Sequence, residues 1–438
     1  MFRNIILEKL ILPFGDFIFR TNFYKKLKFW RKFDNYSSHD LIDYQNTQLK
    51  KQLIYAINNI EKYKHVNFLN SESAGELLNK FSILSKDDLR NDFYKLNINS
   101  ENKTIKIYSS GSTGIRSFVN MDVNDLMSCQ ALTIHIWELC GYRIGSSAIQ
   151  TGISLDRSKF KKLKDFFFGI VYVPAFTLSS KDLNAICKKL LRNKKMTLIG
   201  YPSSINIIAE YALENNFDIK IERYIGLGDA MLPTYKKNIK KAFHCKVLET
   251  YGASEGFQIG FQVDLNYLYI FSPQVYLELL DDNNRPVKDG EIGHVVVTRL
   301  DNKQMPLIRY KIGDLAIKLP KEKYPNKRKL NFLLLEKVVG RNTDIILLPD
   351  NRKLVVHSFT GVFEHIEEIK QFKIIQKNSK GITIECVPSE KTMQLPIEKI
   401  KSKLQEFILD ENFLICIEKV TEIKSSKSGK VQIIESLL

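Results

Sequence analysis

The strongest constraint on the fold of this 438-residue sequence is the alternation of two patterns from about residue 103 onward. Short apolar runs of strand length are separated by longer amphipathic stretches at 181–193, 203–216 and 233–243. Strands that alternate with helices predict an α/β domain with a largely parallel sheet, because each helix carries the chain back to the start of the next strand. The expected strands are 105–108, 148–153, 170–173, 198–200, 224–227 and 246–249.

The residues on either side of this region follow other patterns. Apolar residues recur at helical spacing between 39 and 99, where Ser85-Lys-Asp-Asp is a typical helix start. After the parallel region the sequence becomes rich in strand-like runs, which end at a charged loop over 320–331. The strands expected there are 267–271, 275–281, 293–299 and 314–319, and those expected near the C-terminus are 371–377, 382–387 and 414–420, with a helix at 396–409.

These patterns predict a chain of the α/β class in three parts. A helical segment, 1–102, packs on a large α/β domain, 103–340, which has mixed sheets and a β-rich subdomain. A small α+β domain, 341–438, follows. The composition agrees with a folded chain, because 44% of the residues are hydrophobic and global disorder is thereby excluded.

The charge of the chain indicates an anionic partner. Lys and Arg number 66 against 49 Asp and Glu, which gives a net charge of +17 and favours a nucleotide, a nucleic acid or an anionic membrane surface. Residues 1–33 hold eight of the basic residues against two acidic ones, interleaved with apolar residues. This segment is either a basic amphipathic helix on a membrane or a helix packed on the domain with a solvated basic face, and the pattern slightly favours the second.

The remaining composition narrows the class of protein further. The six cysteines form no C-x-x-C pair and have no zinc-finger spacing, so free thiols in a reducing cytosol are expected. The longest apolar run, 166–176, is too short to span a bilayer. The N-terminus is not a signal peptide, since Glu8 and Lys9 interrupt its apolar stretch.

The first candidate binding motif is Tyr108-Ser-Ser-Gly-Ser-Thr-Gly114, which follows an expected strand. Gly111 and Gly114 allow conformations in which successive N–H groups converge on an anion, and Ser110, Ser112 and Thr113 add hydroxyl donors. The loop is of the phosphate-binding kind, although it lacks the G-x-x-x-x-G-K-[ST] pattern of P-loop NTPases. Taken alone, it is equally compatible with an ordinary turn.

Two further motifs contain strand-like runs. In Glu249-Thr-Tyr-Gly-Ala-Ser-Glu255, Tyr251 offers a flat face for a purine ring and Gly252 lets the backbone approach that ring. Glu255 is suited to hold Mg²⁺, which prefers oxygen ligands. In Ile308-Arg-Tyr-Lys-Ile-Gly-Asp314, the carboxylate of Asp314 can accept two hydrogen bonds from a ribose diol. Each acidic residue can equally be a solvated or capping carboxylate at a turn.

The last two motifs lie in the C-terminal quarter. Val339-Gly-Arg341-Asn-Thr-Asp344 stands at the expected domain boundary, where Arg341 can donate to ribose or phosphate oxygens. Ser425-Ser-Lys-Ser-Gly-Lys430 places Lys430 after a glycine, where its charge can reach a carboxylate and an α-phosphate. A lone Gly-Arg pair or a lone lysine means little in so basic a chain.

The order of these five motifs resembles that of the ANL adenylating superfamily, which contains acyl- and aryl-CoA synthetases, adenylation domains and luciferases. Three further stretches, 199–204, 226–229 and 295–310, are similar to the phenylacetate–coenzyme A ligase-like adenylyltransferases often linked to capsular polysaccharide biosynthesis. The resemblance covers nearly the whole chain. It implies ATP-dependent activation of a carboxylic acid as an acyl-adenylate with release of pyrophosphate, then transfer to coenzyme A, a carrier-protein thiol or an amine.

The resemblance also assigns roles to residues of this sequence, with ATP and Mg²⁺ as cofactors and coenzyme A as one candidate acceptor. The ATP phosphates would be held by Ser110, Gly111, Ser112, Thr113 and Gly114. Adenine would be framed by Gly228, Asp229, Ala230, Tyr251 and Gly252. Ribose would be bound by Asp314 and Arg341. The catalytic group would be Lys430, Glu255 with its Mg²⁺, and Thr113. The C-terminal domain would rotate between half-reactions about a hinge at 341–344.

The sequence departs from the family pattern in three places. Arg116 stands where the family loop usually has a proline, which adds a phosphate contact or only replaces a structural residue. The stretch 320–339 lacks the cysteine cluster that the branch often carries, so no structural metal is expected. Thr343 occupies a hinge position that is often acidic, which leaves the pivot undefined.

A second class of function remains open at this point. The charge is also that of a basic protein that binds nucleic acid or a membrane on a degenerate adenylating-enzyme fold. Against it, every candidate catalytic residue is present, and the basic residues are not paired with an aromatic stacking motif. The expected location is the cytoplasm, with residues 1–33 available for peripheral contact with the inner face of the membrane, and no specific nucleic acid is expected as a partner. For the acyl pocket, 135–142 and 201–207 are candidate linings, although a core role is favoured for His135 and Trp137.

Overall fold

The chain is described here by a computed structural model, which divides into two compact units. The first unit comprises 1–231, 235–312 and 317–337, and the second comprises 232–234, 313–316 and 338–438. The residues described are 2–98, 104–108, 118–152, 158–175, 178–341, 345–350, 353–355, 359, 362–363, 366, 368–389, 394–423 and 433–437.

The chain begins with helices that pack on the first unit. Helix α1 (Phe2–Ile6), the π-helix η1 (Leu7–Ile11) and α2 (Leu12–Ile18) form one continuous helical segment. Helix α3 (Phe23–Arg31) and the 3₁₀ turn η2 (Lys32–Asn35) follow, and α3 packs along α8 (Val123–Leu139). The indole N–H of Trp30 donates to the carbonyl of Ser128 at 3.1 Å, which anchors α3 to α8.

The next helices begin at capping boxes. In α4 (Ser38–Asn59), α5 (Ala74–Leu78) and α6 (Lys86–Asn91), the residue before the helix is a serine whose hydroxyl accepts from the third helical N–H. The acidic side chain at that third position accepts from the serine backbone in return. The helix start predicted at Ser85 is therefore confirmed. Short helix α7 (Phe93–Leu96) ends this part.

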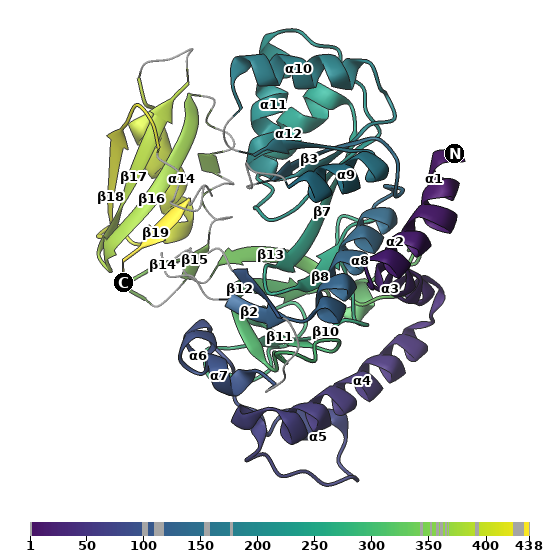
Figure 1. Cartoon of the computed structure of the whole chain (residues 1–438). Coiled ribbons are helices and arrows are strands. Elements are labelled where there is room, and N and C mark those ends of the chain that lie inside the picture. The colour runs from purple at the N-terminus through teal and green to yellow at the C-terminus, as the bar shows by residue number, and fades with distance from the viewer. Residues whose placement is uncertain are drawn as a thin grey trace. The chain divides into compact units, whose positions relative to one another are not determined.

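Among the described residues, eleven strands form one sheet (Figure 1) in the order β10-β11-β12-β13-β9-β8-β7-β6-β5-β3-β4. The parallel half runs from β7 to β4, as the alternating pattern predicted. Its strands are β3 (Ala148–Gly152), β4 (Ile170–Pro174), β5 (Thr197–Gly200), β6 (Arg223–Gly226) and β7 (Lys246–Ala253). The helices between them are α9 (Lys159–Phe168), α10 (Ser180–Leu191), α11 (Pro202–Glu214) and α12 (Pro233–Phe243).

The other half of the sheet is the β-rich part of the chain. Strand β8 pairs antiparallel with β7 and with β9, and β10 pairs antiparallel with β11. One predicted strand, 314–319, is wrong at its start, because β12 already begins at Tyr310. The strands are β8 (Phe257–Phe261), β9 (Leu268–Ile270), β10 (Val275–Leu280), β11 (Ile292–Arg299), β12 (Tyr310–Lys318) and β13 (Leu334–Arg341).

Strand β1 (Ile105–Tyr108) lies outside this sheet. It forms where the apolar run predicted a strand, but it pairs antiparallel with β2 (Phe118–Met121) in a separate two-stranded sheet. A strand-like run in sequence does not specify its partner, since pairing depends on the turn geometry and the rest of the fold.

The parallel strands lie between two hydrophobic cores, because successive side chains of each strand point alternately into one core and then the other. Leu198 and Tyr224 belong to the core shared with α10, α11 and α12, whereas the residues that follow them, Ile199 and Ile225, belong to the core shared with α3 and α8. Successive side chains of a strand point to opposite faces of the sheet, so a strand that is buried on both faces needs a continuous apolar run. These are the runs that the sequence shows.

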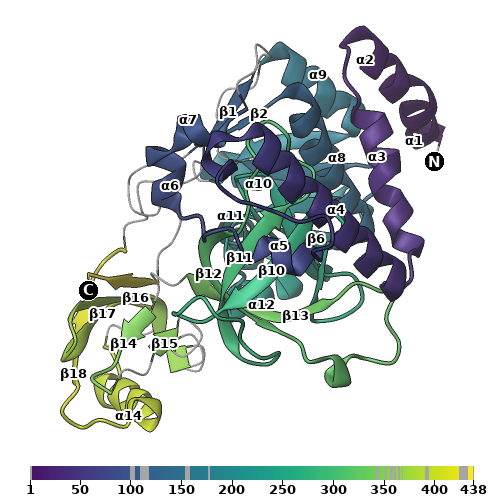
Figure 2. The same cartoon turned by 90° about the horizontal axis from the view of Figure 1, so that it is seen from below.

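The second unit has its own core and sheet. Strands β18, β17, β16 and β19 form a sheet in that order, and α14 (Ile397–Ile408) packs on it (Figure 2). The predicted α+β pattern is confirmed by these elements. The strands are β14 (Ile345–Leu347), β15 (Lys353–Val355), β16 (Ile369–Asn378), β17 (Gly381–Pro388), β18 (Leu414–Lys419) and β19 (Ile434–Ser436).

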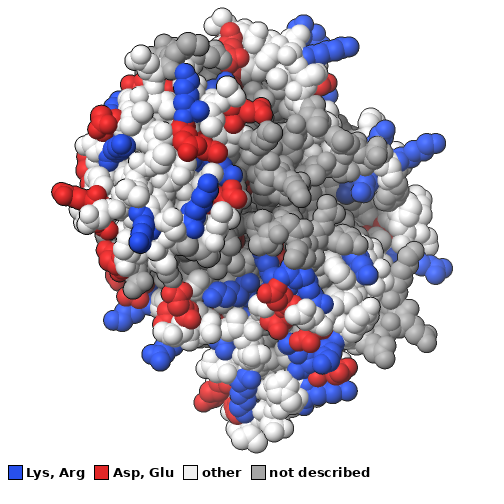
Figure 3. Space-filling view, turned by 90° about the vertical axis from the view of Figure 1, so that its left-hand side faces the viewer, with Lys and Arg blue, Asp and Glu red and all other residues white. Residues whose placement is uncertain are grey.

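Two surface properties bear on the partners of the chain. Within the described residues, no helix combines the length and apolar character needed to cross a membrane. On the face shown in Figure 3, basic side chains are interspersed with acidic ones, so the described residues of that face form no broad patch of one sign.

Candidate functional site

The candidate site of the first unit lies where parallel strands end. Gly200 of β5 is in register with Gly226 of β6, and Gly226 is in register with Glu249 of β7. The segments that leave β5 and β6 therefore start side by side at the carboxyl edge of the parallel strands, next to β7, which continues to Ala253. This edge is where open α/β sheets generally bind ligands, because loops and helix N-termini converge there.

The segment after β6 is built around a glycine. Gly228 has a φ of +74°, and a β-carbon added there would lie 2.7 Å from Cε1 of Tyr201, the residue that follows β5. Only glycine avoids both the backbone strain and the clash. The ring of Tyr201 consequently lies against the backbone of Gly228, while Gly228 itself and Ala230 are exposed.

Asp229 has one buried oxygen without a partner. Its Oδ1 accepts a hydrogen bond from the backbone N–H of Ala230 at 2.8 Å, but no hydrogen bond to the buried Oδ2 occurs among the described residues. Burial raises the pKa of Tyr201, and the nearby charge of Asp229 raises it further. A buried, unpaired carboxylate oxygen is costly, and a ligand donor such as an exocyclic amino group would satisfy it.

The adjacent strand contributes Tyr251 and Gly252. The pairing of β7 with β8 shifts register between these two residues. A β-carbon on Gly252 would lie 2.5 Å from the carbonyl oxygen of Phe257, so glycine is required for this close approach. Tyr251 is half-buried and Gly252 is exposed. Gly228, Asp229 and Ala230 thus follow β6, the strand that pairs with β7, and β7 carries Tyr251 and Gly252.

Glu255 lies two residues beyond the end of β7 and is 5% exposed. Its Oε1 accepts a hydrogen bond from the hydroxyl of Tyr310 at 2.9 Å, and the ring of Tyr310 stacks on Phe257 at 6.2 Å. This contact fixes the direction of the carboxylate. The described residues contain no group of three His, Cys, Asp or Glu suited to a metal. A Mg²⁺ ion on Glu255 would therefore take most of its oxygen ligands from phosphates and water, which is its usual preference beside nucleotides.

The ribose candidates fall in the second unit. Asp314 is half-buried and lies in the middle of β12 rather than at a strand start, because the strand begins earlier than predicted. Arg341 is the last residue of β13, and only its backbone is described. Their contribution to a nucleotide site stays a prediction.

The other candidates lie outside the described residues. They are the five members of the phosphate loop and the C-terminal lysine: Ser110, Gly111, Ser112, Thr113, Gly114 and Lys430.

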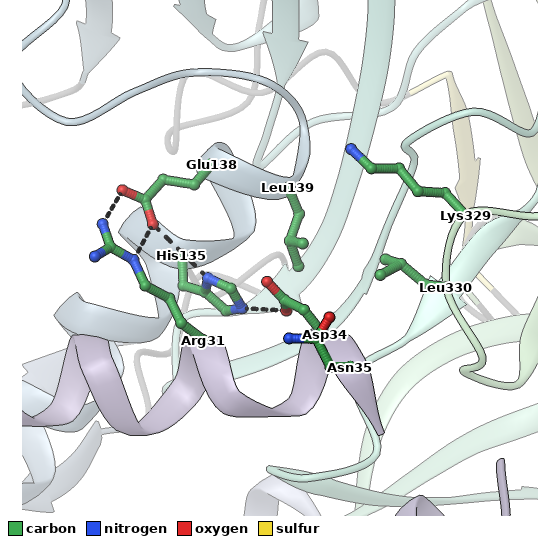
Figure 4. Close-up of a pocket in the computed structure, with 8 residues that line it drawn as sticks. All are labelled: Arg31, Asp34, Asn35, His135, Glu138, Leu139, Lys329 and Leu330. Carbon is green, nitrogen blue, oxygen red and sulfur yellow. Dashed lines mark hydrogen bonds and ion pairs between the residues drawn. The ribbon is translucent and has the colours of Figure 1, made fainter. Parts of the chain in front are cut away.

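A polar pocket of about 360 Å³ lies elsewhere in the first unit (Figure 4), between α8, the end of α3 with η2, and the segment at 329–330. His135 is 1% exposed, and its Nε2 lies 3.0 Å from Oδ1 of Asp34. Glu138 accepts two hydrogen bonds from Arg31, at 2.6 and 2.9 Å. The burial of His135 supports the core role favoured from sequence, and Trp137 is also buried.

Sequence reasoning missed two tyrosines of the candidate site. Tyr310 was part of a recognised stretch but had no assigned role, and its bond to Glu255 joins positions 55 residues apart. Tyr201 lay in a candidate acyl-pocket segment, whereas the structure packs it on Gly228. No local signal could reveal either contact, because both arise from the order of strands in the sheet.

No protein-family model matches the sequence. Protein CapK of Staphylococcus aureus is 24% identical over 444 residues, which cover 97% of this chain and 96% of that protein. The phenylacetate-coenzyme A ligase of Pseudomonas putida is 23% identical over 309 residues, which cover 68% of this chain and 67% of the ligase.

Solved structures show the same fold. A 2-hydroxyisobutyryl-CoA ligase in its postadenylation state aligns with a TM-score of 0.71 at 17% identity, over 90% of this chain and 88% of the ligase. ATP-bound MatB from Rhodopseudomonas palustris aligns with a TM-score of 0.56 at 14% identity, over 75% of this chain and 66% of MatB. These matches confirm the resemblance predicted from the motif order: the chain is similar to the phenylacetate–coenzyme A ligase-like branch of the ANL superfamily and has the fold of adenylate-forming ligases.

Proposed function

We propose that the chain is an AMP-forming ligase. It activates a carboxylic acid with ATP as an acyl-adenylate and releases pyrophosphate. It then transfers the acyl group to coenzyme A, a carrier-protein thiol or an amine. The observation that carries the proposal is the position of the 228–230 segment, which follows β6 beside β7, the strand that carries Tyr251 and Gly252. In that segment the buried Oδ2 of Asp229 accepts no hydrogen bond from the described residues. The full-length similarity to Protein CapK and the similarity to phenylacetate-coenzyme A ligases support it.

The proposed chemistry begins with a carboxylate oxygen that attacks the α-phosphorus of ATP. One P–O bond forms to the acid while the bond to the β-phosphate oxygen breaks, and pyrophosphate leaves. The thiol or amine then attacks the acyl carbon, and AMP leaves as a far better leaving group than hydroxide. Such a reaction depends on positioning and on neutralising charge rather than on covalent help from the protein.

In this proposal each group of candidate residues has a separate role. Asp229 and Tyr251 orient adenine, Asp314 and Arg341 hold the ribose, and the loop at 110–114 donates to the phosphates. When bound, Mg²⁺ would neutralise charge on the phosphates, and Glu255, directed by Tyr310, would hold it. Lys430 would deliver a positive charge to the reacting carboxylate and α-phosphate.

We also propose a setting for this activity. The chain works in the cytoplasm, where its six cysteines, all free, would remain reduced. The branch that it resembles suggests cell-surface polysaccharide biosynthesis as its context. A sugar acid is therefore a leading candidate for the acid, and contact of residues 1–33 with the inner face of the membrane would bring the enzyme to that context.

A carboxylate-dependent ATP–pyrophosphate exchange assay tests the proposed function. Sugar acids, aryl acids and amino acids are assayed side by side, with ATP affinity measured separately. We expect exchange that depends on one class of acid and on Mg²⁺. If ATP binds but no acid in the panel supports exchange, the ligase proposal fails. If ATP does not bind and the chain instead binds DNA in a salt-sensitive way, the degenerate binding protein is the better interpretation.

Two substitutions test the residue roles within the same assay. Lys430→Ala and Glu255→Gln should each lower exchange at least about 100-fold, because each removes charge stabilisation at the reacting phosphate. Lys427→Ala, three residues before Lys430 in sequence, and Glu214→Gln, an exposed residue of α11, are the matched controls and should keep full exchange. Full exchange by Lys430→Ala would show that the C-terminal assignment is wrong.

A further inference from the structure

The helical segment formed by α1, η1 and α2 buries only one of its sides. Leu7 and Leu12 belong to the core of the first unit. The side-chain amide of Asn4 donates to the carbonyl of Ile144 at 2.9 Å, and a β-carbon on Gly145 would meet Leu7 at 3.0 Å. This side fixes the segment against the loop at 144–146.

The opposite side of the segment is also apolar, but it is exposed. Seven large hydrophobic residues lie within 15 positions, and Phe17 alone is 82% exposed. A surface helix normally has a polar outer face, and contiguous apolar patches usually mark an interaction site. The seven residues and their exposed fractions are Ile5 (38%), Ile6 (38%), Leu10 (64%), Phe14 (65%), Phe17 (82%), Ile18 (52%) and Phe19 (55%).

The charges around this apolar side are positive. The two acidic residues of the segment already have partners inside the fold. Glu8 pairs with Arg31 at 3.3 Å, and the carboxylate of Asp16 accepts from backbone N–H groups at the start of α3. Lys9 and Arg20 are exposed. Helix α3 adds three further exposed lysines, Lys25, Lys28 and its C-cap residue Lys32.

Helix α9 extends the same surface. Figures 1 and 2 both place α9 beside α1 and α2, and the ring of Phe168 lies 6.1 Å from that of Phe23. Its outer side repeats the combination of apolar and basic residues, since Leu163 is 53% and Phe166 is 71% exposed. The acidic residue of α9, Asp165, is buried. Four lysines of the helix are exposed: Lys159, Lys161, Lys162 and Lys164.

We propose that the outer sides of α1–η1–α2 and α9 form one membrane-docking surface that binds anionic lipid. The helices would lie in the plane of the interface, with their phenylalanine and leucine side chains among the acyl chains and their lysines at the headgroups. The N-terminal helical segment and α9 both contribute to the surface, although residues 19–158 separate them in sequence. The inference deepens the membrane contact proposed above for residues 1–33, and vesicle binding tests it separately from the proposed reaction.

The charge distribution selects this occupant over a second copy of the chain. In a symmetric dimer the same surface would face itself, so the lysines of two α9 helices would repel one another. An anionic bilayer instead offers negative charge and apolar depth together. The intermingled charges on the face in Figure 3 offer no such combination.

Flotation of the full chain with lipid vesicles tests the proposal. The vesicles contain either phosphatidylcholine alone or phosphatidylcholine with phosphatidylglycerol. We expect binding to the anionic vesicles at physiological salt, at least about tenfold weaker binding to neutral ones, and weakening at high salt. Equal binding to both vesicle types, or no binding to either, would overturn the proposal.

Two sets of variants locate the binding surface. Leu10→Glu/Phe14→Glu/Phe17→Glu and Lys161→Glu/Lys162→Glu/Lys164→Glu should each reduce vesicle binding at least about tenfold, with unchanged exchange activity in the absence of lipid. Leu69→Glu/Tyr94→Glu, with 65% and 89% exposure elsewhere, is the matched control. All substituted side chains are exposed, so folding should be preserved. If the first variant only dissociates a dimer that light scattering detects, the surface is a contact between copies and the proposal fails.

Discussion

At the scale of single residues, Arg299 shows how the fold supports the candidate site. It is fully buried, and its Nε donates to Oδ1 of Asp301 at 2.8 Å. A β-carbon on Gly256 would lie 2.6 Å from Nη1 of Arg299. The guanidinium therefore packs directly beneath the residue that follows Glu255, and it helps to set the shape of that turn.

Replacing Arg299 should be strongly destabilising. Arg299→Met leaves the half-buried carboxylate of Asp301 without its charge partner, and we expect the free energy of unfolding to fall by about 3 kcal/mol. Urea denaturation measures the change. Arg299→Met/Asp301→Asn removes both charges and should recover part of the loss. A single variant as stable as the parent chain would contradict this view of the pair.

Tyr310 is the residue whose importance becomes visible only in the structure. Tyr310→Phe removes the hydrogen bond from the tyrosine hydroxyl that directs Glu255, so the Mg²⁺ concentration for half-maximal exchange should rise about tenfold. Tyr269→Phe is a suitable control, because it removes a hydroxyl that donates to Asp264 at 2.8 Å and leaves Glu255 unchanged. A lower maximal rate with unchanged Mg²⁺ dependence would argue against a positioning role.

At the scale of elements, α8 is joined to α3 and η2 by a partly buried ionic network, in which His135 is the buried member. Burial lowers the pKa of His135, but its hydrogen bond to Asp34 and its ion pair with Glu138 at 3.8 Å outweigh burial and raise that pKa above its ordinary value. Burial raises the pKa of Glu138, and its ion pair with His135 and its hydrogen bonds from Arg31 reverse the effect and lower it. Arg31 and Lys329 are the other charged groups that line the pocket around His135.

This network predicts a pH dependence of stability. A histidine whose folded-state pKa is raised binds a proton on folding, so its contribution is complete below the ordinary pKa of about 6.5 and is lost as the pH rises through the folded-state value. The melting temperature should therefore fall from about pH 6.5 upward. His135→Gln should flatten that slope, whereas His39→Gln, at an exposed histidine, should not. Identical slopes in the parent chain and His135→Gln would refute the assignment.

The elements themselves were predictable to different degrees. Buried parallel strands such as β5 and β6 were found because both of their sides are covered, which forces continuous apolar runs. The partner of β1 and the start of β12 were not found, because pairing and strand ends depend on residues far away in sequence. The capping box at Ser85 was found because its hydrogen bonds are local.

At the scale of the whole molecule, the fold class followed from the order of patterns, and the relationship to adenylate-forming ligases followed from the order of motifs. The net charge of +17 indicated only an anion of some kind. The structure shows where part of this positive charge lies, since lysines of α9 and of the N-terminal segment stand beside exposed apolar residues. The sequence alone could not predict that these two segments lie close together, because their proximity arises from the tertiary packing.

The division of the chain into two units has a consequence for gene rearrangement. The second unit is not one continuous stretch, since it includes 232–234 and 313–316 as well as 338–438. Suppose that recombination exchanged only the C-terminal portion between two related genes. The hybrid would then combine 338–438 from one gene with 232–234 and 313–316 from the other. Hybrids that carry the matching 313–316 from the same donor should therefore be the ones that evolution, or a protein engineer, retains.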